Sequence, residues 1–232
     1  MPPEASPPVH RAAIAAAHDE ADRVGQTLDA LKAALPGATL LVADDASVDG
    51  TAEVAMRHGA WVVRRGRSHG KGGNVSAAAE ALLGELEGDP VVLLCDADLG
   101  VSAEALVALV ESVEGGECDL AVASFARREG GGFGLALGYA QRSIERLSGF
   151  RAEAPISGQR AMRASTLRAL LPFAEGFGME LGMTVDAVRA GYRLCEIELP
   201  LEHRATYRTL AGFLHRARQL RDFRKATAAR RE

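Results

Sequence analysis

The sequence has no long hydrophobic run and only three cysteines. No apolar run in the 232 residues reaches the roughly 18 residues of a membrane span, and the N-terminal MPPEASPPVHR lacks the apolar core of a signal peptide. Cys95, Cys118 and Cys195 are odd in number, show no CxxC spacing and fall in or beside predicted strands. We therefore expect buried free thiols rather than a disulfide framework or a zinc site, in a cytosolic protein.

The formal net charge of -4 hides an uneven distribution. From His203 to the end, nine basic residues stand against Asp222 and Glu232, a balance of +7, which leaves -11 on residues 1–202. Such a tail suits an anionic membrane surface, nucleic acid, or a solvated last helix that packs on the acidic body. We favour the packed helix, expect no nucleic-acid partner, and keep peripheral contact with the inner face of a membrane as the alternative.

The rest of the composition, 47% hydrophobic and 25% charged, is that of an ordinary globular domain. We expect a disordered, proline-rich leader at 1–10, one domain at 11–204, and a basic C-terminal helix or tail at 205–232. Strand-like runs at 11–17, 38–43, 60–63, 91–95, 118–124, 156–163 and 192–199 alternate with helical patterns. This order predicts an α/β fold with a doubly wound, mostly parallel central sheet and right-handed crossovers.

The candidate site centres on Val91–Gly100, VVLLCDADLG. Five apolar residues predict a strand buried on both faces, and the run ends in Asp96 and Asp98. Because side chains alternate along an extended segment, both carboxylates point the same way with Ala97 between them, and they suit a hard divalent cation that would hold a diphosphate. The structural alternative is that they cap the helix predicted from Ser102.

Acidic turns at 18–20, 44–49 and 96–98 each follow a predicted buried strand. If these strands are neighbours, their carboxyl ends bring the acidic side chains along one crevice. Asp44 or Asp45 would accept hydrogen bonds from the imide N–H of a base or from ribose hydroxyls, because an ionised carboxylate is purely an acceptor. For Asp49 we expect a capping role at the next helix.

Three further segments carry candidate groups, and each has a structural alternative. Gly70–Gly73, GKGG, is predicted as a loop that opens a helix and could bind an anion, although it is not a Walker A loop and a solvated basic turn is equally consistent. His203 could complete a cation site with Asp98, and Arg204 could hold two phosphate oxygens; the alternative is a surface histidine in a basic stretch. Glu180 could be a base whose pKa burial raises, or a favourable charge in a first helical turn.

The segments IAAAHDE, ADDASVDGT, HGKGGN and CDAD follow one another in the first hundred residues. They resemble the IPAYNEE, VDDGSxDGT, GKG and DxD motifs of family 2-like glycosyltransferases with the GT-A fold, and the resemblance spans residues 12–204. Later segments, PISGQRAMR, LPFAEGFGMELGMTVDA and EHR, are similar to those of glucosyl-3-phosphoglycerate synthases and related retaining enzymes. Gln159 stands where those synthases tend to carry an acidic residue, and the glycine-rich loop at 130–134 has no counterpart that we can map.

The resemblance implies roles for individual residues. Asp98 and His203 would hold the metal ion, Mg²⁺ or Mn²⁺, and Glu180 would contact the hydroxyls of the donor sugar, or act as base if the reaction inverts. Arg204 would stabilise the leaving diphosphate. The nucleotide-sugar pocket would be lined by Ala16, His18, Glu20, Asp44, Asp45, Lys71, Asp96 and Ala97.

These implications favour a metal-dependent glycosyltransferase that moves glucose or mannose from a nucleoside diphosphate sugar to a hydroxyl or phosphate acceptor. The acceptor would be a small phosphorylated molecule resembling 3-phosphoglycerate, or a lipid phosphate, and a homodimer is left open. The alternatives are a polyprenyl-phosphate glycosyltransferase at a membrane surface and a non-catalytic nucleotide-sugar binding module. A phosphohydrolase fits less well, because its DxDx[TV] motif would need Thr or Val where Gly100 stands.

Overall fold

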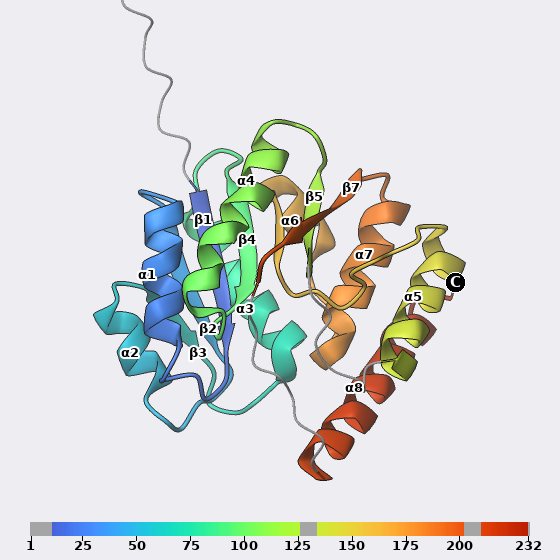
Figure 1. The fold of residues 1–232 in the computed structure, drawn as a ribbon, viewed down its shortest axis with the longest axis horizontal. Coiled ribbons are helices and arrows are strands. Elements are labelled where there is room, and N and C mark those ends of the chain that lie inside the picture. The colour runs from blue at the N-terminus through green and yellow to red at the C-terminus, as the bar shows by residue number, and fades with distance from the viewer. Residues whose placement is uncertain (1–10, 126–133, 202–209, 232) are drawn as a thin grey trace, which may run out of the picture.

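The alternating apolar and helical patterns become strands and helices close to where the sequence predicts them (Figure 1). The structure, a computed structural model, describes residues 11–125, 134–201 and 210–231. The strands are β1 Arg11–Ala17, β2 Thr39–Asp44, β3 Trp61–Arg64, β4 Val91–Asp96, β5 Leu120–Phe125, β6 Arg160–Arg163 and β7 Leu194–Leu199. The α-helices are α1 Val24–Ala34, α2 Thr51–Arg57, α3 Gly70–Glu85, α4 Val107–Glu114, α5 Gly134–Ser148, α6 Ala164–Leu170, α7 Met179–Arg189 and α8 Leu210–Ala228, and the 3-10 helices are η1 Gly100–Leu106 and η2 Gly176–Gly178.

The strands form one sheet in the order β3-β2-β1-β4-β6-β5-β7. β1 to β4 are parallel neighbours, and their apolar runs are buried, as continuous hydrophobic strands predict. In the register, Ala17 lies opposite Asp44 and Ala16 lies opposite Asp96. The acidic ends of β1, β2 and β4 therefore meet at the same edge of the sheet.

The second half of the sheet differs from the predicted strand at 156–163. Only Arg160–Arg163 form β6, which lies antiparallel between β4 and β5, while β7 is parallel to β5. Because β6 runs backwards, its first residue starts at the edge where β4 ends. The sheet is thus mostly parallel, as predicted, and its single reversed strand among the described residues delivers Arg160 and the residues before it to the candidate site.

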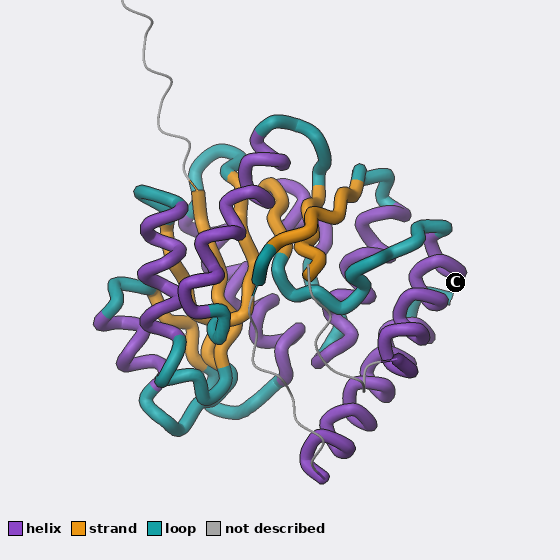
Figure 2. Tube along the Cα trace, in the orientation of Figure 1, coloured by secondary structure: helices purple, strands orange, loops and turns teal. Residues whose placement is uncertain are grey.

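Helices cover both faces of the sheet (Figures 1 and 2). α1, α2, η1 and α4 pack on one face, where Leu28 and Leu31 of α1 are at most 1% exposed. α3, α6 and α7 pack on the other face. Each such leucine contributes about 1.5–3 kcal/mol to folding, so these two layers fix the strand ends relative to one another.

α8 is a packed helix; whether the basic segment also contacts a membrane surface stays a prediction. Its Phe223 is fully buried in a cluster with residues of α5 and α7, and Arg230, just beyond the helix, forms an ion pair with Asp186 of α7 at 2.5 Å. None of the helices in the described ranges is long and apolar enough to cross a membrane. Among the α8 side chains whose burial the structure describes, residues 218–228, the exposed basic ones are Arg218, Arg221, Arg224 and Lys225.

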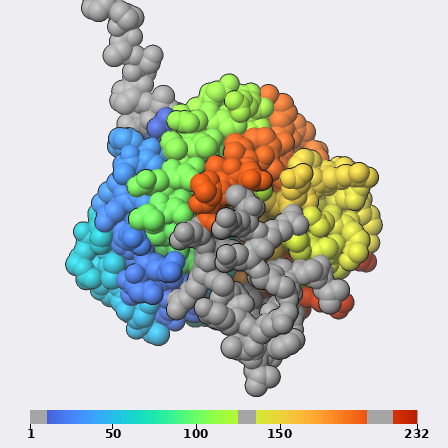
Figure 3. Space-filling model, in the orientation of Figure 1, coloured from blue at the N-terminus to red at the C-terminus, as the bar shows by residue number. Residues whose placement is uncertain are grey.

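The prediction of free cysteines is wrong for one pair. Cys118 and Cys195 form a disulfide with their Cα atoms 5.9 Å apart, whereas Cys95 is a buried free thiol as predicted. Cys118 precedes β5 and Cys195 lies on the neighbouring β7, an arrangement of residues 77 positions apart that CxxC spacing cannot reveal. Ser112 of α4 lies 3.7 Å from both sulfur atoms, and Figure 3 shows α4 (green) beside β7 (orange) on this face.

Four predictions fall on residues outside the described ranges. They concern the leader at 1–10, the glycine-rich loop at 130–134, His203 and Arg204. Of that loop, only residue 134 lies within the described ranges. The domain boundaries near residues 10 and 204 therefore stay predictions.

Candidate active site

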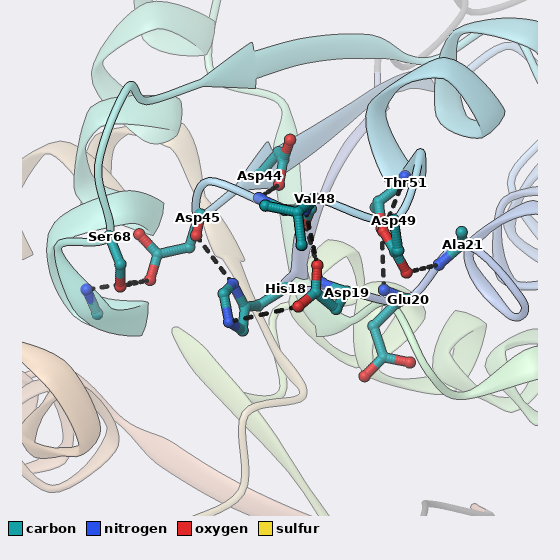
Figure 4. A network of polar contacts seen from close by, with 12 residues as sticks. His18, Asp19, Glu20, Ala21, Asp44, Asp45, Val48, Asp49, Thr51 and Ser68 are labelled. Carbon is teal, nitrogen blue, oxygen red and sulfur yellow. Dashed lines mark hydrogen bonds and ion pairs between the residues drawn. The ribbon is translucent and has the colours of Figure 1, made fainter.

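The turns after β1 and β2 are joined by a network of polar contacts (Figure 4). The backbone N–H of Asp19 donates to Ser47 Oγ at 2.9 Å, and the N–H of Val48 donates to Asp19 Oδ1 at 2.8 Å. His18 is exposed, and its Nδ1 lies 2.9 Å from the main-chain oxygen of Asp45. These contacts tie two loops that are about thirty residues apart in sequence into one rigid rim.

Asp49 joins the same network at the start of α2. Its carboxylate accepts hydrogen bonds from the backbone N–H and hydroxyl of Thr51 and from the N–H of Ala21, and the Thr51 hydroxyl accepts one from the N–H of Glu20. Burial works to raise the pKa of Asp49, but the hydrogen bonds, above all those from Thr51, outweigh it and hold the pKa below its ordinary value. Asp49 therefore binds the first N–H of α2, as a capping role predicts, but it lies one residue before the N-cap position, which Gly50 occupies.

Asp44 and Asp45 are both buried and both bind the protein itself. Asp44 accepts a hydrogen bond from Ser47 N at 2.9 Å and forms an ion pair with Arg64 at 3.3 Å. Asp45 accepts three hydrogen bonds at the start of α3, from Ser68 Oγ, His69 N and Gly70 N, at 2.7–3.1 Å. A carboxylate offers about four acceptor positions, so the predicted contact of Asp45 with a base would use the remaining one.

The GKGG segment is not a loop before a helix, as predicted, but the first turn of α3. The helix starts at Gly70 because the Asp45 carboxylate occupies the position that a capping residue would fill, and its charge complements the helix dipole. A Cβ on Gly72 would clash with the main-chain oxygen of Ala174, so this glycine is required by close packing. The phosphate-binding role of the segment stays a prediction.

Lys71 links the two halves of the chain. Its Nζ lies 2.5 Å from Asp96 Oδ1 at the end of β4 and 2.9 Å from Glu180 Oε1 in the first turn of α7. We call these three residues the Lys71 clasp; their side chains are 21%, 34% and 5% exposed, respectively. Burial works to lower the pKa of Lys71, but the charges and hydrogen bonds of Asp96 and Glu180 outweigh it and raise the pKa above its ordinary value.

Gln159 completes the surroundings of Asp96. Its Nε2 donates to Asp96 Oδ2 at 2.8 Å, while its Oε1 accepts a hydrogen bond from Ser157 Oγ at 3.2 Å, which orients the amide. A Cβ on Gly158 would occupy the space of Lys71 Nζ and of the Asp96 carboxylate. Gln159 was not predicted as a site residue, although its difference from the acidic residue of similar synthases was the available signal.

The turn that carries Asp98 is held by α1. Thr27 Oγ1 donates to the main-chain oxygen of Ala97 at 2.8 Å and accepts a hydrogen bond from Gly100 N at 2.9 Å. Arg23 donates to the main-chain oxygen of Asp98 at 3.0 Å. No sequence pattern pointed to Thr27 or Arg23, since both lie about 70 residues away from their partners.

The structure therefore brings together most of the predicted site. The rim at the ends of β1, β2 and β4 contains Ala16, His18, Glu20, Asp44, Asp45, Asp96, Ala97 and Asp98, and Lys71 and Glu180 join it from α3 and α7. His203 and Arg204 lie outside the described residues, and within the described ranges no group of three or more His, Cys, Asp or Glu side chains could hold a metal ion. The role of each site residue stays a prediction.

Carboxylates at the carboxyl ends of parallel strands, in a sheet covered by helices on both faces, define a doubly wound α/β protein, a class of fold in which ligands bind at this edge. A family model described as glycosyl transferase family 2 matches residues 13–172. The chain belongs to this family and is a glycosyltransferase, as the sequence motifs indicated.

A characterised relative and several solved structures are similar to the chain. The undecaprenyl-phosphate mannosyltransferase of Micrococcus luteus is 30% identical over 203 residues, which cover 81% of each chain. Glucosyl-3-phosphoglycerate synthase from Mycobacterium tuberculosis in complex with phosphoglyceric acid has a TM-score of 0.79 and 22% identity, over 96% of this chain and 80% of that chain. The same synthase in complex with Mn²⁺, uridine-diphosphate-glucose and phosphoglyceric acid has a TM-score of 0.76 and 23% identity, over the same shares. These structures confirm the predicted GT-A fold.

Proposed function

We propose that this protein is a metal-dependent glycosyltransferase that moves a hexose from a nucleoside diphosphate sugar to a hydroxyl or phosphate acceptor. The observation that carries the proposal is the meeting of Asp96, Asp98, Lys71 and Glu180 at the carboxyl ends of β4 and its neighbours. This edge is where open α/β sheets bind nucleotides. The synthase with a similar fold binds a uridine diphosphate sugar and Mn²⁺ or Mg²⁺, which supports the same donor class here.

Among the described residues of the rim, Asp98 has the chemistry of a ligand for a divalent cation, although no three such side chains there form a complete site. Asp98 supplies carboxylate oxygens, which suit Mg²⁺ and Mn²⁺, on a turn that Thr27 and Arg23 hold in place. Asp96 binds Lys71 and Gln159 through its two oxygens, and the resemblance to family 2-like glycosyltransferases implies Asp98 as the metal ligand. We propose His203 as the second ligand. When bound, the ion would supply positive charge for the leaving diphosphate.

In the proposed reaction, the bond from sugar C1 to the diphosphate oxygen breaks, and its electron pair leaves with the diphosphate. The acceptor oxygen forms the new bond to C1. A hydroxyl acceptor loses its proton to the leaving diphosphate or, if the configuration inverts, to Glu180. Lys71 and Arg204 are the cationic side chains proposed to stabilise the charge that develops on the diphosphate.

The test compares Asp98→Ala with Glu87→Ala, which removes an exposed carboxylate just before β4, at the opposite edge of the sheet. Loss of one contact to developing charge costs about 3–4 kcal/mol, so Asp98→Ala should reduce turnover by a factor on the order of hundreds. Nucleotide release is measured with a panel of nucleoside diphosphate sugars, acceptors, and Mg²⁺ or Mn²⁺. Turnover unchanged in Asp98→Ala, or in excess chelator, would contradict the metal-dependent mechanism.

A polyprenyl-phosphate acceptor is a second candidate, favoured by the mannosyltransferase of Micrococcus luteus and by the exposed basic side chains of α8. The basic side chains and a lipid-phosphate acceptor would both suit a protein of the cytoplasm that contacts an anionic membrane surface. Removal of α8 is a poor test, because Phe223 is part of the core. Vesicle flotation should instead compare Arg218→Glu/Arg224→Glu with Arg57→Glu/Arg168→Glu, which reverses two exposed charges on α2 and α6. Loss of flotation only in the first variant supports a lipid acceptor; no flotation of the wild type favours a small phosphorylated acceptor.

A further inference from the structure

Arg160, the first residue of β6, is fully buried next to the Lys71 clasp. Its Nε donates to the main-chain oxygen of Ser157 at 2.9 Å and its Nη1 donates to Thr184 Oγ1 at 3.0 Å, while Nη2 has no hydrogen-bond partner among the described residues. Burial lowers the pKa of Arg160 to about 10, although the charges of Glu180 and Glu196 oppose this shift. A buried arginine is costly, so its presence needs an explanation.

Thr184 connects this arginine to Glu180. The Thr184 hydroxyl accepts the hydrogen bond from Arg160 and donates one to the main-chain oxygen of Glu180 at 3.0 Å. Thr184 is 2% exposed, so water does not compete for its hydroxyl. The first turn of α7, which presents the Glu180 side chain to Lys71, is therefore held from β6.

The preceding residue of the same segment holds the other carboxylate of the clasp. Gln159 donates to Asp96 at 2.8 Å, and Asp96 and Glu180 share the ammonium group of Lys71. Gln159 thus binds the carboxylate of Asp96, and the adjacent Arg160, the first residue of β6, is linked through Thr184 to the main chain of Glu180. Arg160 also adds a second positive charge beside two negative carboxylates and one lysine, so the four groups are neutral together.

We propose that Arg160 and Thr184 are positioning residues that hold Glu180 against Lys71, so that the start of β6 sets the distance between the two carboxylates of the clasp. This inference rests on the proposed function, in which Glu180 faces the donor sugar. Neither residue contacts substrate; both act through the placement of Glu180.

The test uses Thr184→Val, which keeps the shape of the side chain and removes its hydroxyl, and Thr184→Ser, which keeps the hydroxyl. The matched control is Thr227→Val on α8, where a fully buried threonine hydroxyl has no partner among the described residues. We expect Thr184→Val to lower kcat by tenfold or more with the KM for the donor within twofold of wild type, because only the reacting geometry changes. Thr184→Ser should recover kcat to within about threefold, and Thr227→Val should leave kcat unchanged.

A double-mutant cycle assigns the effect to the Arg160–Thr184 contact. If both residues act through one contact, Arg160→Met/Thr184→Val should lower kcat no more than Arg160→Met alone. Arg160→Lys replaces Arg160→Met if the latter does not fold, because it keeps the charge but loses the forked geometry. Additive losses in kcat would overturn the proposed relay.

A structural readout separates this inference from the proposed function. In a crystal structure of Thr184→Val, the distance from Lys71 Nζ to Glu180 Oε1, 2.9 Å here, should exceed the about 4 Å of an ion pair. An unchanged distance, or a kcat of Thr184→Val equal to wild type, overturns the positioning role while leaving the glycosyltransferase intact. If the wild-type protein transfers no sugar from any donor, the proposed function is wrong. The crystal structure of Thr184→Val then still tests the positioning role.

Discussion

The carboxylates at the ends of β1 and β2 are held differently from those at β4 and α7. In the first region the carboxylates bind mainly backbone N–H groups; the pairs are Asp19 with Val48, Asp44 with Ser47, Asp45 with His69 and Gly70, and Asp49 with Ala21 and Thr51. In the second region Asp96 and Glu180 bind the side chains of Lys71 and Gln159. Side chains change rotamer within nanoseconds where they are not packed, whereas backbone contacts break only when a loop moves.

This difference assigns different work to two sets of residues of the same chemical type. The first region is a rim whose acidic groups bind mainly the backbone of the loops that they join. The Lys71 clasp is held by side chains alone, so under the proposed function a ligand would compete for its groups without breaking contacts between loops. Four substitutions test the comparison, and they are ordered by the size of the expected effect.

Lys71→Met should have the largest effect. It leaves two carboxylates close together without their shared cation, and breaking a buried ion pair costs about 3–5 kcal/mol. Since the Asp96 side chain is 34% exposed, we expect the low end of this range, about 3 kcal/mol, in the free energy of unfolding measured with urea at pH 7. Lys32→Met, at an exposed lysine of α1, is the control and should change the free energy of unfolding by less than about 0.5 kcal/mol. Equal changes in the free energy of unfolding for the two substitutions would show that the Lys71 clasp does not stabilise the fold.

Asp45→Ala should come next, because it removes a charged acceptor from three donors at the start of α3. Loss of a helix cap costs up to about 2 kcal/mol, and we expect this value for the free energy of unfolding. Asp45→Asn keeps an acceptor oxygen and should cost less than half as much. Hydrogen exchange of the His69 and Gly70 amides provides the local measurement. Unchanged protection of these amides in Asp45→Ala would contradict the capping role.

The comparison also explains which parts of the site the sequence could predict. Continuous apolar runs predicted β1, β2 and β4, and the acidic turn after each run predicted the edge, because both signals lie within a few adjacent residues. The start of α3 was predicted after the GKGG segment rather than at Gly70, since the carboxylate that caps it belongs to Asp45, 25 residues earlier in the chain. The sequence pattern of an antiparallel β6 does not differ from that of a parallel strand, so the delivery of Gln159 and Arg160 to the site was not predictable.

The contacts that the sequence missed are those between distant side chains. Lys71 and Glu180 were both identified as candidates, but their ion pair joins residues on α3 and α7 and has no local signature. The same holds for Cys118 and Cys195, which meet because β5 and β7 are neighbours. Residue type and strand order predicted which groups reach the edge, and packing of the second half of the chain decided which of them touch.

Thr27→Val tests the turn of Asp98, where both kinds of contact meet. Here Thr27 of α1 binds the main chain of the turn, while the side chains of Lys71 and Gln159 bind the carboxylate of Asp96. Removal of the Thr27 hydroxyl leaves the buried Ala97 oxygen and Gly100 N–H without their partner, which should lower the free energy of unfolding by about 1–2 kcal/mol and reduce turnover more than Asp45→Asn does. Thr27→Ser should restore both quantities in urea unfolding and in nucleotide-release assays. Turnover of Thr27→Val at the wild-type level would show that the turn tolerates movement.

Asp49→Asn should have the smallest effect, and the effect should depend on pH. Because the folded state holds the pKa of Asp49 below its ordinary value, the ionised group stabilises the fold above the unfolded pKa of about 3.9, and this stabilisation is lost as the pH falls through the folded pKa. The side chain is exposed and screened by solvent, so the difference in the free energy of unfolding between wild type and Asp49→Asn should be below about 1 kcal/mol at pH 7 and vanish near pH 2. Asp22→Asn, at an exposed carboxylate of the loop after β1, next to the Ala21 that Asp49 binds, is the control. A difference that persists at pH 2 would mean that the amide is excluded by shape rather than by charge, and the rim would then owe its rigidity to packing.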